Sequence, residues 1–444
     1  MPIDSLFISP KDQSAIFRKH HIEYEELDNG ARIAAVSLRN PESMNANIDC
    51  HFGTGSYFDP PGKLGLHHFL EHLINKPVRE ISQTRDVTLN ASTSFAEFGH
   101  HSRGPITSGV ADYGILDMIP RIADRLARIL SGYDDLDEVI DSERHVIQNE
   151  IDKYHGDHSW VAMQHIKRDL LGSNNPLLIE TAGTQETLAR MKRADFESLA
   201  AEICTSSILT VEAKNIGPTK HMAPLMKSLI KTYSKFPKTG LSRTVDWSIV
   251  DQHAPLPDHQ TFTHKTKLKN NLSSIAFSWL VDCKELSTCS HAFGLYRDFV
   301  QERIHKYSRQ QGIGYTAAIM HYQGMRKRMI IIRFDTSNHS LTQLKQMARK
   351  IEKDLIGSLL RLSREDLDTI LKTHNKREHA IPYGSSWHFQ WAMHGLERYG
   401  KFVSGAAMQA QNANIRSQDV QHWEQLLTSK PANAITIAGD YAQE

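Results

Sequence analysis

Patterns of apolar and polar residues predict strands and amphipathic helices along this chain. Strand-forming residues fill 24–36, where LDNG supplies a turn, and a second strand is expected in IDCHFGTGSYFD, so the chain opens as a hairpin-like β unit. GKLGLHHFLEHLINK has apolar residues at helical spacing, which predicts a helix over about 64–75 that Pro77 prevents from continuing. Two more helices are expected in IPRIADRLARILSG and DDLDEVIDSERHVIQNEIDKYH. The second of these has an apolar stripe formed by Leu136, Val139, Ile140, Val146, Ile147 and Ile151. This mixture is typical of the α/β or α+β class.

The two halves of the chain have similar patterns. DFESLAAEICTSSILTVEAKNIG and DVQHWEQLLTSKPANAITIAGDY each predict a helix, a turn and a strand. Upstream, LDEVIDSERHVIQNEIDKYHGDHSW pairs loosely with SREDLDTILKTHNKREHAIPYGSSW. We interpret these matches as a degenerate internal duplication. A proline-containing stretch with little helical periodicity separates the copies, so we predict a first domain over 1–235, a linker over 236–262 and a second domain over 263–444.

Composition narrows the classes of function. The 444 residues include 52 basic and 51 acidic side chains, with no block of like charge, so neither a nucleic acid nor an anionic membrane is an expected partner. No apolar run reaches the ~18 to 20 residues that cross a bilayer, and MPIDSLFISPKDQ lacks the features of a signal peptide. The four cysteines are scattered without a CxxC pair, which indicates neither a disulfide framework nor a cysteine zinc site. We therefore expect a soluble, cytoplasmic protein.

One predicted helix carries a motif with metal-binding chemistry. His68 and His72 stand four residues apart in H-x-x-E-H, which places both imidazoles on one face about one turn apart. Such a pair suits a zinc ion, and Glu71 between them is the natural general base for a zinc-bound water. On its own, a histidine pair at this spacing usually consists of surface or packing residues. A zinc site therefore requires a third ligand from elsewhere in the sequence.

The later helix offers two carboxylates for that role. Glu143 and Glu150 lie seven residues apart in ERHVIQNE, about two turns along one helical face. Either could approach the metal. Glu150 would complete a His, His, Glu ligand set, whereas Glu143 would suit the role of accepting a hydrogen bond from a ligand histidine and fixing its tautomer.

Together these motifs resemble those of the pitrilysin or insulin-degrading-enzyme superfamily of inverzincin zinc peptidases, specifically half-length members related to mitochondrial processing peptidase. The matching segments are L-x-N-G at 27–30, G-S at 55–56, G-L-x-H-x-L-E-H at 65–72, N-A-x-T at 90–93 and ERHVIQNE at 143–150, in which the matching residues are Glu143, Arg144, Val146 and Glu150. The resemblance implies that His68, His72 and Glu150 bind Zn²⁺. It also implies that Glu71 is the catalytic base and that Glu143 supports catalysis.

The resemblance extends into the second half of the chain. SRQQGIGYTAA is similar to the family's L-R-x-K-x-G-x-x-Y-x-V segment, with Tyr315 in register and Arg309 one position beyond the family's arginine. These two residues are expected to bind substrate and to stabilise the oxyanion in catalysis, the alternative being a β-hairpin with an ordinary packing tyrosine. Asn90, with Ala91 beside it, is expected to bind the substrate backbone as an added strand, the alternative being simple turn chemistry.

Two segments depart from the family pattern. His67 stands where the family has a small apolar residue, and it is either a surface residue or a neighbour of the site. After N-A-x-T, the run SFAEFGHHSRG replaces the usual Thr and Tyr, so the wall of the substrate cleft is expected to differ. Substrate preference therefore cannot be taken from relatives.

The resemblance also implies an architecture and an activity. The fold would be two similar sandwich domains, each a mainly antiparallel sheet packed with helices. Full-length relatives contain four such units around a chamber, so this chain would need a second copy or a homologous subunit to enclose one. The activity would be zinc-dependent hydrolysis of short or unfolded peptides. The alternatives are a maturation peptidase for one precursor, acting with a partner subunit, and a noncatalytic structural subunit.

Overall fold

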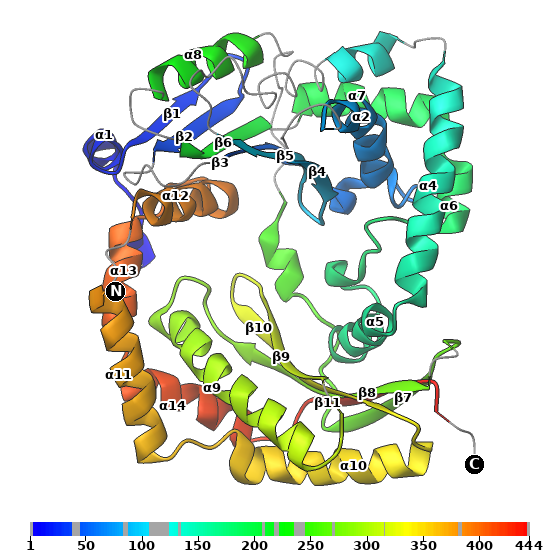
Figure 1. Cartoon of the computed structure of the whole chain (residues 1–444), viewed down its shortest axis with the longest axis vertical. Coiled ribbons are helices and arrows are strands. Elements are labelled where there is room, and N and C mark those ends of the chain that lie inside the picture. Colours follow the sequence, from blue (N-terminus) through cyan, green and yellow to red (C-terminus); the bar gives the residue numbers. More distant parts are fainter. Residues whose placement is uncertain are drawn as a thin grey trace.

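A computed structural model describes residues 3–37, 45–82, 88–105, 124–131, 135–206, 209–216, 222–234, 245–268, 271–314, 316–380 and 384–441. Its strands form two sheets, one in the upper and one in the lower part of Figure 1, with helices on both faces of each. The predicted mixed α/β fold of two sandwich-like units is therefore confirmed. Within the described residues, no helix has both the length and the apolar character needed to cross a bilayer.

The first half contains the strands and helices β1 (Ile22–Glu26), β2 (Arg32–Ser37), β3 (Asn45–Phe52), β4 (Thr88–Thr93), β5 (Phe98–Pro105), β6 (Leu209–Ile216), α1 (Pro10–Lys19), α2 (Leu66–Ser82), α4 (Leu136–Gly156), α5 (His158–Leu171), α6 (Gln185–Arg190), α7 (Arg193–Ser206) and α8 (Met222–Tyr233). The second half contains β7 (Gln260–Lys265), β8 (Leu272–Asp282), β9 (Thr316–Gln323), β10 (Lys327–Ser337), β11 (Ala434–Gly439), α9 (Thr288–Gln310), α10 (Leu341–Asp354), α11 (Arg364–Ala380), α12 (Ser385–Tyr399), α13 (Gly405–Ala413) and α14 (Ser417–Thr428).

The two sheets repeat one topology. The first has the strand order β1-β2-β6-β3-β5-β4 and the second β7-β11-β8-β10-β9. Without β1, the orders correspond strand for strand, and each sheet has one parallel pair, β2 with β6 and β7 with β11. The matched sequence segments occupy equivalent places, because α7 leads into β6 and α14 leads into β11. The structure thus supports the predicted internal duplication.

Each half of the chain contains one helix that packs on the sheet of the other half. Apolar residues of α12, including Phe389 and Met393, pack against Ala34 and Val36 of the first sheet. Correspondingly, α5 packs on the second sheet through a group of residues that includes Ile166 and Leu170. In Figure 1, α12 lies beneath the first sheet and α5 lies above the second, so both exchanged helices occupy the space between the sheets.

The zinc-motif helix is longer than the sequence indicated. Pro77 does not end α2, which continues to Ser82. Proline cannot donate a hydrogen bond to the carbonyl of Leu73, four residues earlier, and that loss normally breaks a helix. Here Nε of Arg125 donates to the Leu73 oxygen at 3.0 Å. A side chain from a distant segment therefore replaces the missing backbone donor and satisfies the carbonyl.

Three other expectations need adjustment. Val146 is 41% exposed rather than part of the buried stripe of α4, whose buried positions include Ile140, Glu143 and Ile147 at successive helical spacings. The opening hairpin consists of β1 and β2, with Tyr24 opposite Ala34, whereas β3 pairs with β5 and β6. β7 begins at 260, inside the range predicted as linker, because it pairs with β11.

Candidate metal centre

One buried carboxylate fixes the start of α2. Asp59 accepts hydrogen bonds from the backbone N–H groups of Gly65 (2.7 Å) and His67 (3.0 Å), donors that have no partner within the first turn of a helix. Its Oδ1 also lies 2.6 Å from Nδ1 of His67, whose Nε2 lies 2.8 Å from Oγ1 of Thr54. The His67 side chain is fully buried and both its ring nitrogens have partners. His67 therefore supports the helix and is not a metal donor.

Helices α2 and α4 together present three potential ligands. Oε2 of Glu150, on α4, lies 3.7 Å from Nε2 of His68 and 3.5 Å from Nε2 of His72, both on α2. Ligand atoms about 2.1 Å from a tetrahedral zinc ion are about 3.4 Å apart. The donor atoms all lie within 4.8 Å of one another. Two imidazoles and one carboxylate in this arrangement fit zinc and leave one coordination position for another ligand.

Glu143 lies behind one of these histidines. Its Oε2 is 3.3 Å from Nδ1 of His72, and its side chain is buried. A carboxylate in this place fixes the tautomer in which Nε2 of His72 is free to bind metal. Among the described residues, the buried Nδ1 of His68 has no hydrogen-bond partner. Within the described part of the chain, a carboxylate thus lies at Nδ1 of His72 but not at Nδ1 of His68.

Glu71 lies beside the ligand set, with Oε2 4.0 Å from Nε2 of His68. The same oxygen accepts a hydrogen bond from Oγ1 of Thr93 at 2.9 Å. Thr93 is the last residue of β4, so the orientation of the Glu71 carboxylate is tied to that strand. The N-A-x-T pattern contains Thr93, but the pattern by itself does not indicate this contact.

Tyr154 contacts the carboxylate of the third ligand. Its hydroxyl donates to Oε1 of Glu150 at 2.9 Å, whereas Oε2 is the oxygen that faces the two histidines. The Tyr154 ring also stacks on Trp160 of α5, with centroids 6.2 Å apart. The sequence motifs do not include Tyr154, although residues four apart on a helix are neighbours and its spacing from Glu150 could have indicated the contact.

The charges at the site favour a cation. Burial, followed by repulsion from His72, lowers the pKa of His68 to about 4, which keeps its imidazole neutral at neutral pH. Burial also opposes a charge on His72, but hydrogen bonds to Glu143 and Glu150 overcome this and raise its pKa to about 9. The hydrogen bond with His72 is the main cause that lowers the pKa of Glu150 to about 2. A proton and a metal ion therefore compete for His72 between two carboxylates, and metal binding would release that proton.

A cavity of about 650 Å³ opens onto these groups. Asn90 and Ala91 of β4 line it, together with Tyr154 and Trp160. Because β4 is the last strand of the first sheet, an extended peptide could pair with its outer edge. The two residues predicted to bind substrate in the first half therefore lie in the same cavity as the potential metal ligands.

The residues predicted in the second half are not brought to this cavity by the described structure. Tyr315 lies outside the described residues. Arg309 is exposed in the last turn of α9 and is not among the described residues that line the cavity. Their substrate-binding and catalytic roles stay predictions.

The fold is that of M16 peptidase structures. It superimposes on the peptidase M16 inactive domain from Pseudomonas fluorescens with a TM-score of 0.68 and 13% identity, over 95% of this chain and 98% of that one. It matches the periplasmic protease PqqL from Escherichia coli with a TM-score of 0.68 and 17% identity, over 94% of this chain and 47% of that one.

In sequence, the chain is 25% identical over 222 residues to the probable mitochondrial-processing peptidase subunit beta from Arabidopsis thaliana. The match covers 48% of this chain and 39% of that relative. No protein-family model matches the chain. The resemblance inferred from the motifs is thus confirmed by a sequence relative and by similar folds.

Proposed function

We propose that the chain is a zinc metalloendopeptidase that hydrolyses short or unfolded peptides. The observation that carries the proposal is the convergence of His68, His72 and Glu150 beside the carboxylate of Glu71 in one cavity. Zinc held there would lower the pKa of a water ligand to about 7 and polarise the peptide carbonyl. Relatives named as peptidases support the reaction class.

The positions of the side chains at this site support peptide hydrolysis. Glu71 would take a proton from the attacking water while the water oxygen bonds to the carbonyl carbon. It would then give that proton to the amine nitrogen as the C–N bond breaks. The hydrogen bond from Thr93 keeps the Glu71 carboxylate oriented for both transfers. A substrate strand along β4, held by Asn90, would place the scissile bond beside the metal.

We also propose that the chain acts with a second homologous chain, either another copy or a related subunit, and that the pair encloses a chamber. The chain spans about half the length of PqqL, and its Arabidopsis relative is named as a subunit, which supports the need for a partner. Maturation of one precursor peptide by such a complex is the narrower form of this proposal. A cytoplasmic location stays a prediction.

A noncatalytic structural subunit is the competing proposal, because one similar structure is named an inactive domain. The two proposals differ in what they require of this chain. A structural subunit needs neither a ligand set nor a base. The donor atoms and the buried Glu71 carboxylate favour the peptidase.

The deciding experiment compares cleavage of a mixed pool of unstructured peptides by the wild type and by Glu71→Gln, with zinc quantified in both. We expect equal zinc content and at least ~100-fold slower cleavage by the variant, because the general base is lost. Glu186→Gln is the matched control, since Glu186 is exposed and pairs only locally with Arg190. Undiminished cleavage by Glu71→Gln would disprove the role of this base. Absence of zinc from both proteins would favour the structural subunit.

A further inference from the structure

Two of the scattered cysteines meet at the junction of β8 and α9. Cys283 follows the last residue of β8, and Cys289 is the second residue of α9. The two side chains hydrogen-bond to each other, and neither cysteine is in a disulfide. Cys283 is 5% exposed, whereas Cys289 is partly exposed at the edge of the same core. Their sequence spacing matches no CxxC motif, so only the fold shows that they form a pair.

A fixed cation lies beside this thiol pair. The Arg328 guanidinium is buried and lies over the rings of Phe293, at 4.5 Å from the centroid, and Trp423, at 5.3 Å. It donates to the backbone oxygen of Ser290 at 3.1 Å and to the Ser290 hydroxyl at 2.6 Å. Because Ser290 directly follows Cys289, these bonds hold the positive charge at the first turn of α9.

The surroundings of Cys283 are those of a reactive thiol. The hydrogen bond from Cys289, opposed by burial and helped by Arg328, holds the pKa of Cys283 below its usual value. The long helix α9 also begins at this point, with Ser287 as its N-cap. Thiolates next to arginine and at helix N-termini are the forms that react with oxidants.

We infer that Cys283 and Cys289 form a modification site, at which a peroxide reversibly oxidises the two thiols to a disulfide. The sulfur of Cys283 attacks one oxygen of hydrogen peroxide, the O–O bond breaks, and a sulfenic acid and water result. The sulfur of Cys289 then attacks the sulfenic sulfur, the S–S bond forms, and a second water leaves. Two thiols lose two electrons and two protons, and one peroxide is reduced to two waters.

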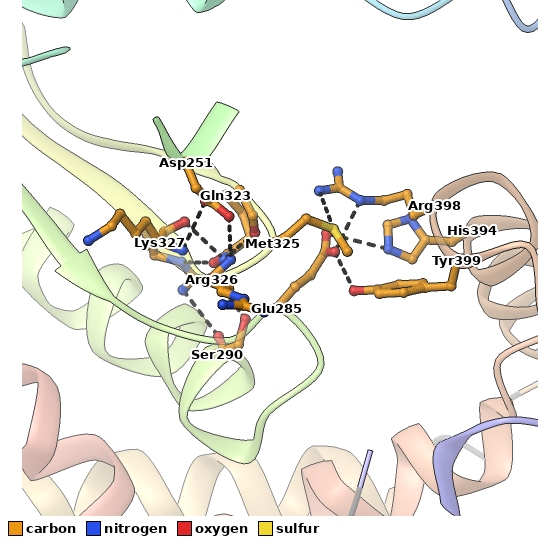
Figure 2. A network of polar contacts seen from close by, with 12 residues as sticks. Asp251, Glu285, Ser290, Gln323, Met325, Arg326, Lys327, His394, Arg398 and Tyr399 are labelled. Carbon is orange, nitrogen blue, oxygen red and sulfur yellow. Dashed lines mark hydrogen bonds and ion pairs between the residues drawn. The ribbon is translucent and has the colours of Figure 1, made fainter. Parts of the chain in front are cut away.

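The modification would act on a segment that contacts the other half of the chain. Glu285 lies between the two cysteines, and its carboxylate holds three side chains of α12, as Figure 2 shows. Nε of Arg398 lies 3.0 Å from Oε2 of Glu285, and the Tyr399 hydroxyl donates to the same oxygen at 2.6 Å. Nε2 of His394 lies 3.5 Å from Oε1 of Glu285. Since α12 packs on the first sheet, a disulfide across 283–289 would restrain the segment that links the two halves.

The test treats the full chain with hydrogen peroxide at pH 7, alkylates the remaining thiols and maps the peptides by mass spectrometry. We expect loss of two of the four thiols, a linked peptide that joins Cys283 to Cys289, and full recovery with dithiothreitol. Cys50, buried in the core of the first half, is the internal control and should stay reduced. Cys283→Ser and Cys289→Ser should each abolish the link.

The charge requirement is tested with two variants of Arg328. Arg328→Met should slow formation of the link about tenfold, because the cation that favours the thiolate is lost. Arg328→Lys keeps a positive charge and should react at nearly the wild-type rate. Cys289 oxidised to sulfinic or sulfonic acid without the link would overturn the inference. Equal, slow labelling of Cys283, Cys289 and Cys50 before and after peroxide would overturn it as well. Both readouts are independent of zinc and of peptidase activity.

Discussion

At the scale of single residues, the least expected participant is Tyr154. Its hydroxyl binds the oxygen of Glu150 that faces away from the histidines, so one carboxylate oxygen is left to bind the metal. Partners of this kind typically contribute 10–100-fold to metal affinity. The geometry of the third ligand thus depends on a group that does not itself touch the metal.

Tyr154→Phe is expected to weaken zinc affinity about tenfold while the thermal unfolding temperature of the metal-free protein stays unchanged. Competition with a chromogenic chelator measures the affinity. Tyr24→Phe is the matched control, because the Tyr24 hydroxyl donates to Glu26 on β1, away from the centre. Equal zinc affinity in Tyr154→Phe and the wild type would show that the hydroxyl does not act on Glu150.

His291 is expected to make the folded state sensitive to acid. Burial, reinforced by the cation of Arg328, lowers the pKa of His291 from 6.5 to about 4. As pH falls below 6.5, the unfolded chain binds a proton that the folded chain does not bind until about pH 4. The free energy of unfolding therefore decreases over this range, by up to about 3 kcal/mol for this group.

Urea unfolding at pH 7.5 and pH 4.5 measures this effect. His291→Phe should lose clearly less stability on acidification than the wild type, because the titrating group is gone. His145→Phe, which changes an exposed histidine of α4, should follow the wild type. Parallel losses in all three proteins would assign the acid sensitivity to other groups.

At the scale of elements, α2 depends on contacts at both ends. Asp59 accepts hydrogen bonds from backbone N–H groups at the start of the helix. Arg125 donates to the Leu73 carbonyl, which Pro77 leaves without a backbone donor. Asp59→Ala would leave two backbone N–H groups and the His67 ring without their acceptor. We expect this to cost about 3 kcal/mol of unfolding free energy and to weaken zinc binding, because His68 directly follows the affected turn.

Thermal unfolding and chelator competition measure the two effects. Asp137→Ala is the control, since Asp137 forms an exposed ion pair with Arg193 and such pairs contribute at most about 1 kcal/mol. An Asp59→Ala variant as stable as this control would show that Asp59 does not anchor α2.

The sequence predicted those parts of the centre that depend on local spacing. His68 and His72 share a face because they are four residues apart, and Glu143 and Glu150 share one because they are seven apart. It could not predict that Arg125 would allow α2 to pass Pro77, since that contact joins residues distant in the chain. The packing of α5 and α12 on the sheet of the opposite half was unpredictable for the same reason. The apolar pattern of a helix does not indicate which sheet it covers.

At the scale of the whole molecule, the exchange of helices predicts how the chain responds to cleavage. A protease site placed within 236–244 should give two fragments that stay together in gel filtration without denaturant. The reason is that α5 packs on the second sheet and α12 packs on the first, so each fragment keeps apolar contacts with the other. Elution of the two fragments as separate species would contradict this expectation.

Reciprocal placement of α5 and α12 also gives the molecule the connectivity of a domain-swapped dimer whose two copies are joined into one chain. An isolated half would leave an apolar sheet face uncovered and carry a helix with no sheet to bind. Two such fragments could satisfy both needs by pairing. A fragment that comprises only the first half would therefore be prone to self-association, whatever chemistry its metal centre retains.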